Sequence, residues 1–330
     1  MNGEVAYKFF NTLKNGMSLE EVKTSLNLTE TEVMGAIELC NIYGYQIDFV
    51  AHPTKGYVIK KLNNKKVNKD IKPEMDELNH IKLCVVSDTH FGNIHQQLHL
   101  LNNVYEEAYK REIDTVLHCG DLVDGDYLSI RKEQGRQCFL FGFDQQCGYV
   151  VDNYPQIKGM KTHFILGSHD ETHYKNGGAT IEKWLPRLRE DMIFLGQDTG
   201  TINIDNVKIM LDHPGDGSAQ SLSYKPQKRI DNMEAGYKPH VLLIGHYHKS
   251  YYFNYRNVNT ILVPSLCDIT QFQHKKIITN AMGAYFIDIY ADKKGNIHYF
   301  IPEEMVFGPN DMWDEVGKDS KKVKQLKIGY

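Results

Sequence analysis

Aspartate and histidine residues follow five short apolar segments of the sequence, and these are the side chains best suited to chemistry. The segments and the polar motifs after them are 82–87 with Asp88-Thr89-His90, 115–119 with Gly120-Asp121-Leu122-Val123-Asp124, 163–166 with Gly167-Ser168-His169-Asp170, 207–211 with Asp212-His213, and 241–244 with Gly245-His246-Tyr247-His248. Each segment has the length and composition of a buried strand. Because open α/β sheets bind ligands at the carboxyl ends of their strands, we expect these side chains to meet at one sheet edge and to bind a divalent metal there.

The five motifs carry more information together than separately. A single DxH or HxH pattern is more often a set of solvent-facing or hydrogen-bonded side chains than a pair of metal ligands. The ordered set DxH, GDxxD, GxHD, H and GHxH is hard to obtain by chance. Mixed carboxylate and imidazole donors favour Mn, Fe or Zn over Ca, whose sites are built from oxygen alone.

On these motifs, residues 81 to about 300 resemble the calcineurin-like metallophosphoesterase family of bacterial, archaeal and phage type. The resemblance implies an α/β fold, a four-layer αββα sandwich in which two sheets lie between helices. It also implies two divalent metal ions, most often Mn, with Fe, Zn and Ni as alternatives. The implied activity is hydrolysis of phosphoester bonds.

The resemblance also assigns roles to the polar residues of the motifs. The implied ligands are Asp88, His90 and His248 for the first metal, Asp121 for both metals, and Ser168, His213 and His246 for the second metal. A water molecule between the ions is the implied nucleophile. His169 is the implied catalytic residue beside the leaving-group oxygen, either as a general acid or as a cation that stabilises the transition state, and Asp124 orients it through a hydrogen bond. We expect Asp170 to brace the turn rather than to contact a metal.

Position 168 departs from the family pattern. Family members usually have Asn there and offer its amide carbonyl to the second metal, whereas this chain has Ser168. A serine hydroxyl is also a neutral oxygen donor, but the side chain is shorter. We therefore predict weaker binding of the second metal, and slower turnover, than an Asn enzyme shows.

The residues around the motifs narrow the range of possible substrates. Serine/threonine protein phosphatases of the family continue GDxxD with Arg and Gly, whereas Gly125 and Asp126 follow here, and related DNA repair exonucleases generally lack the second aspartate. We predict a phosphodiesterase, either a nuclease or a nucleotide phosphodiesterase. A phosphomonoesterase, and a weakly active or silent protein that serves as a DNA- or protein-binding regulatory module, are the alternatives. Candidates for contacting substrate phosphate are Lys225, Lys228 and Arg229, although solvated surface charge is the more frequent outcome for such residues.

Residues 1–62 have the pattern of a separate small domain. Three helical stripes, the second preceded by a capping box of Ser18 and Glu21, and two strands around residues 52–55 predict a winged helix-turn-helix. The third helix carries glutamates and neither Lys nor Arg, which is unusual for a helix that reads the major groove. The candidate nucleic-acid contacts are Lys55, Lys60 and Lys61. Phosphate binding by these lysines and protein docking or self-association are about equally supported.

The remaining sequence divides the chain further. Residues 63–80 are polar and charged and predict a linker, residues 81–305 form the predicted phosphoesterase domain, and residues 306–330 are a basic tail in which we expect Lys318 to Lys327 to be frayed. The long segment 126–155 follows directly on Asp124. We expect it either to cover the pocket and help select the substrate or to form an ordinary surface helical hairpin.

Composition places the chain among ordinary globular proteins. Hydrophobic residues make up 41% and charged residues 24% of its 330 residues, and the net charge of −4 argues against a protein that coats nucleic acid. No stretch approaches the ~20 apolar residues that span a bilayer, and the first residues do not begin a signal peptide, so we expect a cytoplasmic location. The six cysteines form no CxxC pattern, and we expect buried reduced thiols.

Overall fold

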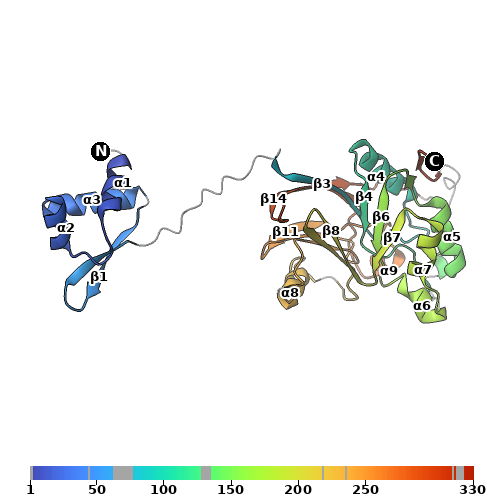
Figure 1. The fold of residues 1–330 in the computed structure, drawn as a ribbon. Coiled ribbons are helices and arrows are strands. Elements are labelled where there is room, and N and C mark those ends of the chain that lie inside the picture. The colour runs from blue at the N-terminus through green and yellow to red at the C-terminus, as the bar shows by residue number, and fades with distance from the viewer. Residues whose placement is uncertain are drawn as a thin grey trace. The chain divides into compact units, whose positions relative to one another are not determined.

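The computed structural model describes residues 3–43, 45–61, 77–127, 135–217, 219–234, 236–313, 316 and 323–330. The chain divides into two compact units, residues 1–73 and 74–330 (Figure 1). Most of the predicted linker lies outside the described residues, as do residues 128–134 of the long segment 126–155.

The first unit contains helices followed by a hairpin, in the order that the sequence predicts. Its elements are α1 Gly3–Thr12, α2 Leu19–Leu26, α3 Glu30–Ile42 and the antiparallel strands β1 Ile47–His52 and β2 Gly56–Lys61. Ser18 and Glu21 form the predicted capping box at the start of α2, and Thr29 and Glu32 form another at the start of α3. Side chains from all of these elements share one apolar core. The assignment of this unit to the winged helix-turn-helix class stays a prediction.

The second unit is built on a six-stranded sheet in the order β14-β13-β3-β4-β6-β7. Its strands are β3 Asn79–Val86, β4 Thr115–His118, β6 Lys161–Ile165, β7 Met192–Gly196, β13 Gly283–Ala291 and β14 Ile297–Val306. Strands β3, β4, β6 and β7 are parallel, whereas β13 pairs antiparallel with β3 and with β14. The segments that follow β3, β4 and β6 therefore leave the sheet at the same edge.

A five-stranded sheet packs against the first sheet. Its order is β11-β12-β10-β9-β8, and its strands are β8 Thr199–Ile204, β9 Val207–Asp212, β10 Val241–Ile244, β11 Tyr251–Tyr255 and β12 Val258–Leu262. Alternation along β3 explains the packing. Ile81, Leu83 and Val85 join the core between the sheets, whereas Cys84 and Val86 join the core on the opposite face.

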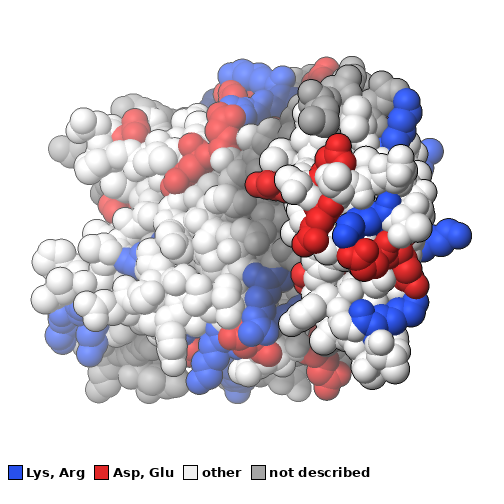
Figure 2. All heavy atoms as spheres, turned by 90° about the vertical axis from the view of Figure 1, so that its left-hand side faces the viewer, with Lys and Arg blue, Asp and Glu red and all other residues white. Residues whose placement is uncertain are grey.

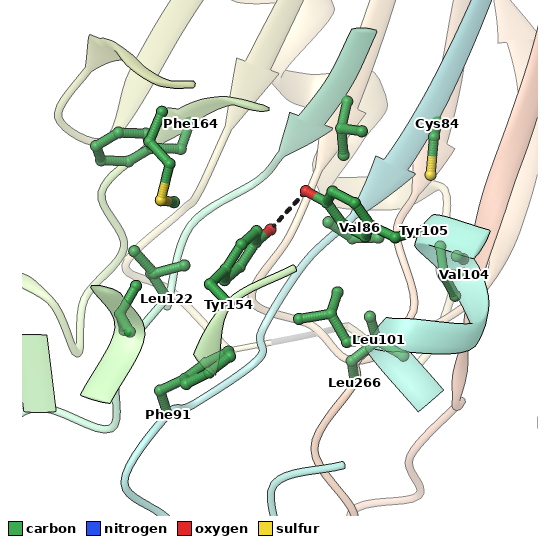
Figure 3. Packing of buried hydrophobic residues seen from close by; sticks show 14 of the residues in the cluster. Cys84, Val86, Phe91, Leu101, Val104, Tyr105, Leu122, Tyr154, Phe164 and Leu266 are labelled. Atoms are coloured by element: carbon green, nitrogen blue, oxygen red, sulfur yellow. Dashed lines mark hydrogen bonds between the residues drawn. The ribbon is translucent and has the colours of Figure 1, made fainter. Parts of the chain in front are cut away.

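Helices cover the outer faces of the two sheets (Figure 1). The helices α4 Leu98–Lys110, α5 Phe143–Asn153 and α7 Ile181–Leu188 pack on the six-stranded sheet, and α8 Tyr224–Asn232 packs on the five-stranded sheet. In the core between the six-stranded sheet and its helices, Tyr105 and Tyr154 share a hydrogen bond of 3.0 Å (Figure 3). Two short helices, α6 Glu171–Gly177 and α9 Gln271–Lys275, lie in loops. The layers are helix, sheet, sheet and helix, which confirms the predicted αββα sandwich.

The end of the chain is not frayed where the structure describes it. Strand β15 Lys327–Ile328 pairs in parallel with β5 Gln156–Ile157, and Asn102 Nδ2 donates a hydrogen bond to Lys324 O at 2.8 Å. The expectation of fraying, made for residues 318–327, is therefore wrong for the described part of that segment, residues 323–327. It depended on local basic charge, whereas pairing with a distant strand orders this segment; Lys318 lies outside the described residues.

The surface charge and the burial of the cysteines are as expected from the composition. On the face in Figure 2, described Lys and Arg side chains lie interspersed with Asp and Glu. All six cysteines are buried thiols, as predicted. No helix in the described part of the chain combines the length and the apolar character that crossing a bilayer requires.

Candidate metal centre

The segments that follow the strands have an unusual backbone conformation. Asp88, His90, Asp121, His246 and His248 all have positive φ, between 44° and 71°. The left-handed region is unfavourable for residues other than glycine, and such residues cluster at functional sites. The backbone in these segments is therefore shaped to aim particular side chains.

The first cluster of donors contains Asp88, His90 and His248. One ligand atom of each residue lies within 4.8 Å of the other two. His248 Nε2 is 3.2 Å from Asp88 Oδ1, and His90 Nε2 is 3.9 Å from that oxygen and 3.5 Å from His248 Nε2. Two imidazole nitrogens that face each other beside a carboxylate have the arrangement of ligands around one cation.

The second cluster contains Asp121, His213 and His246, whose ligand atoms again lie within 4.8 Å of one another. His213 Nε2 is 3.1 Å from Asp121 Oδ2, and the same oxygen is 4.0 Å from His90 Nε2 in the first cluster. Asp121 thus lies between the two clusters, in the position of a carboxylate that bridges two ions.

The turn of residues 167–170 packs against the second cluster. A Cβ atom on Gly167 would lie 2.2 Å from Asp121 Oδ1 and 2.7 Å from His213 Nε2, so the space admits only glycine. The backbone N–H of His169 donates a hydrogen bond to Asp121 Oδ1 at 2.8 Å. Ser168 stands between these two residues, and its carbonyl accepts from Tyr127 Oη at 3.1 Å. The turn holds Ser168 close to the second cluster, and its role as a ligand stays a prediction.

Unpartnered donor atoms test whether the centre suits a metal. Among the described residues, Asp88 Oδ1 and His213 Nε2 are buried and form no hydrogen bond, and the neighbour of each is another potential ligand, His248 at 3.2 Å and Asp121 at 3.1 Å. Buried polar atoms without partners are destabilising, and a bound cation would supply the missing partner. The carboxylate and imidazole donors therefore fit the divalent metal ions that the sequence predicts.

Charges within the centre shift the pKa values of its residues. Burial by itself raises the pKa of Asp88 and of Asp121, but neighbouring imidazoles, above all His248 and His213 respectively, hold both pKa values below their usual range. Burial by itself lowers the pKa of His213, but the Asp121 carboxylate raises it to about 10. Burial lowers the pKa of His246 to about 4. His213 consequently holds a proton that an incoming metal ion must displace.

Second partners orient the imidazoles. Because a carbonyl can only accept, His213 Nδ1 donates to Cys119 O at 2.7 Å, so Nε2 is the nitrogen that binds a metal once its proton is displaced. His90 Nδ1 lies 3.5 Å from Asp124 Oδ1. Such partners fix the tautomer and the ring orientation of metal-binding histidines.

The predicted catalytic pair is connected through the main chain. His169 Nδ1 donates to the carbonyl oxygen of Asp124 at 2.7 Å, whereas Asp124 Oδ1 is 3.8 Å from the same nitrogen. The His169 ring packs edge-on against His90 and Tyr127, with centroid distances of 4.6 and 4.7 Å. A hydrogen bond between His169 and Asp124 is present as expected, but it uses the carbonyl, and the carboxylate faces His90 instead.

Asp170 braces the turn, as the sequence predicts. Its buried carboxylate accepts from Leu122 N, Val123 N and Gly167 N at 3.1, 2.9 and 2.8 Å. These bonds join the segment after β4 to the segment after β6. Asp170 thereby holds the segment after Asp121 and the turn of residues 167–170 together.

The basic residues predicted to contact substrate lie on α8. Lys225 Nζ is 2.8 Å from Asp216 Oδ2, and Arg229 Nε is 3.0 Å from Asp212 Oδ2. Lys228 is exposed. Two of the three cations are thus paired with carboxylates of the segment around His213, and their contact with substrate stays a prediction.

The lysines predicted to contact nucleic acid lie on the hairpin of the first unit. Lys55 Nζ is 2.8 Å from Glu21 Oε1, and Lys61 Nζ donates to Leu13 O at 2.7 Å. Lys60 is exposed. Two of the three lysines thus form contacts within the first unit. DNA binding by this unit stays a prediction.

Sequence reasoning did not single out three residues that contact the centre. Cys138 and Asn93 hydrogen-bond to the Asp124 carboxylate at 2.7 and 2.8 Å, and Gln273 Nε2 lies 2.9 Å from His248 Nδ1. Asn93 follows the first motif closely, but Cys138 and Gln273 belong to no motif. Only the packing of distant loops brings these two residues to the site.

Comparison with known proteins gives matches of two kinds. Residues 81–280 match the family model of the calcineurin-like phosphoesterase superfamily domain. Among solved structures, an archaeal phosphodiesterase has 17% identity and a TM-score of 0.38, and the match covers 68% of this chain and 100% of that one. The phosphoesterase Yfce from E. coli has 12% identity and a TM-score of 0.35, covering 67% and 98%. Zinc-complexed Vps29 from Entamoeba histolytica has 15% identity and a TM-score of 0.34, covering 69% and 100%. No curated protein gives a significant match.

The family match extends over more than half of the chain and contains all five motifs. The chain therefore belongs to the calcineurin-like phosphoesterase superfamily. It is a metal-dependent phosphoesterase, as the motifs predict.

Proposed function

We propose that the chain hydrolyses phosphodiester bonds of nucleic acids or nucleotides at a dinuclear metal centre. The observation that carries the proposal is the convergence of two donor clusters on Asp121. When bound, the two cations supply a nucleophilic hydroxide at neutral pH and offset the charge of the phosphoryl oxygens. The proposed ligands are Asp88, His90 and His248 for one ion, Ser168, His213 and His246 for the other, and Asp121 for both. Mn is the proposed metal.

His169 is the proposed proton donor to the leaving group. Its Nδ1 is engaged by the carbonyl of Asp124, so Nε2 is the nitrogen that can reach substrate. Contacts with His90 and Tyr127 hold the ring in this orientation, and 22% of the side chain is exposed. A proton on Nε2 passes to the departing oxygen as the phosphorus–oxygen bond breaks.

The charges around the clusters favour a diester over a monoester. Among the described residues, no Lys or Arg pairs with the six aspartate and histidine donors or with His169; Arg229 instead pairs with Asp212. A monoester brings up to two negative charges and a diester brings one. As far as the described residues go, the positive charge of the site comes from metal ions and imidazoles, and such a site is better matched to the diester.

Hydrolysis of two model esters tests this proposal. With Mn²⁺ we expect the chain to hydrolyse bis-p-nitrophenyl phosphate faster than p-nitrophenyl phosphate, and then to act on single- or double-stranded DNA. Asp121→Asn should lower the diesterase rate on the order of 10³-fold because it removes the shared anionic ligand. Glu106→Gln, which removes an exposed carboxylate on α4, is the control and should change nothing.

Each contrary result has a defined meaning. A faster rate on the monoester would replace the proposal with a phosphomonoesterase. Hydrolysis of neither ester by metal-loaded protein would contradict it and favour the regulatory binding module. Full activity of Asp121→Asn would show that Asp121 does not bridge the ions.

A further inference from the structure

Cys138 contacts the Asp124 carboxylate although it is remote from every motif. Its Sγ is 2.7 Å from Asp124 Oδ2, while Oδ1 accepts from Asn93 Nδ2 at 2.8 Å. An ionised carboxylate can only accept hydrogen bonds, so the thiol is the donor. Burial, and then the charge of Asp124, raises the pKa of the thiol and keeps its hydrogen in place.

The main chain holds Cys138 in this position. Phe139 N donates to Gly92 O at 2.9 Å, and Asn93 and Cys138 form an antiparallel bridge. The loop after the first motif and the segment around Cys138 therefore lie side by side as extended chains. Both donors to the carboxylate come from this pair, so backbone hydrogen bonds determine where they lie.

The Asp124 carboxylate faces a proposed metal ligand. Its Oδ1 is 3.5 Å from His90 Nδ1, and the opposite ring nitrogen, Nε2, points to Asp88 and His248. This is an ion-pair contact rather than a hydrogen bond, and a carboxylate beside one nitrogen of an imidazole orients the ring and strengthens metal binding by the other nitrogen. If the carboxylate rotated, His90 would lose this support.

We propose that Cys138 is a positioning residue of the metal centre. Its S–H and the Asn93 amide hold the Asp124 carboxylate against His90 and thereby aim His90 at the metal. The inference rests on the proposed dinuclear centre. Cys138 acts as a hydrogen-bond donor in this role, and neither binds the metal nor attacks the substrate.

Calorimetric titration of the metal-free full chain with Mn²⁺ tests this role without measuring turnover. We expect Cys138→Ala and Cys138→Val, which lack the donor, to bind Mn²⁺ about tenfold more weakly at one of the two sites. Cys138→Ser keeps an O–H donor and should bind within about twofold of wild type. Cys147→Ala is the matched control, because Cys147 is also a buried cysteine and lies on α5 rather than beside the Asp124 carboxylate.

Thermal melts of the metal-free variants separate loss of packing from loss of the donor. Cys147→Ala should melt at a lower temperature but keep wild-type Mn²⁺ affinity. Wild-type affinity in both Cys138→Ala and Cys138→Val would overturn the inference, as would a Cys138→Ser variant that binds as weakly as they do. Failure of the wild-type chain to bind Mn²⁺ would overturn the metal centre itself, which is a different and recognisable outcome.

Discussion

Substitution of Gly167 by alanine probes the contact between the turn of residues 167–170 and the Asp121 carboxylate. The new Cβ would lie 2.2 Å from Asp121 Oδ1, whereas ordinary contacts begin at 3.4 Å, so the turn or Asp121 must move by about 1.2 Å. A displacement of about 1 Å in a catalytic arrangement costs about 10²-fold in rate. We therefore expect kcat/KM of Gly167→Ala for bis-p-nitrophenyl phosphate to fall about 100-fold.

The assay needs a control for the general effect of replacing glycine. A Cβ on Gly148 of α5 would meet no atom within 4 Å, so Gly148→Ala should keep full activity and gain about 0.5–1 kcal/mol in free energy of unfolding. Diesterase rates and Mn²⁺ titrations of both variants would be measured together. Near wild-type activity of Gly167→Ala would refute the reasoning, because it would mean that the turn does not pack on Asp121.

Three further predictions concern the metal centre. Ser168→Asn should bind the second Mn²⁺ more tightly and turn over faster, since the longer side chain extends an oxygen donor; titrations and rates without any gain would contradict the role given to Ser168. His169→Gln removes the proton donor but no ligand, so kcat should fall about 10²–10⁴-fold at unchanged Mn²⁺ affinity, and a matching loss of affinity would instead identify a ligand. Mn²⁺ affinity should rise with pH between about 6 and 9, by about tenfold per unit for each proton displaced, because Asp121 raises the pKa of His213 to about 10. Calorimetry at three pH values that gave one constant affinity would contradict this.

The strands and the donor types could be predicted from the sequence because both depend on neighbouring residues. The predicted segment 241–244 coincides with β10, and the other four differ from their strands by at most three residues at either end. Apolar runs of this length form strands, and the residues after them must lie at the sheet edge. The capping box of Ser18 and Glu21 is equally local and was predicted for the same reason.

What contacts each donor was decided only by the tertiary structure. The spacing of GDxxD does not reveal that Asp124 offers its carbonyl to His169 and its carboxylate to His90 and Cys138. The same holds for the strand pairing that orders the C-terminal segment. These contacts join residues far apart along the chain, and their geometry depends on how loops of variable length meet. Residue type and local periodicity determine which side chains lie at the ends of the strands. They do not determine how distant loops pack against one another.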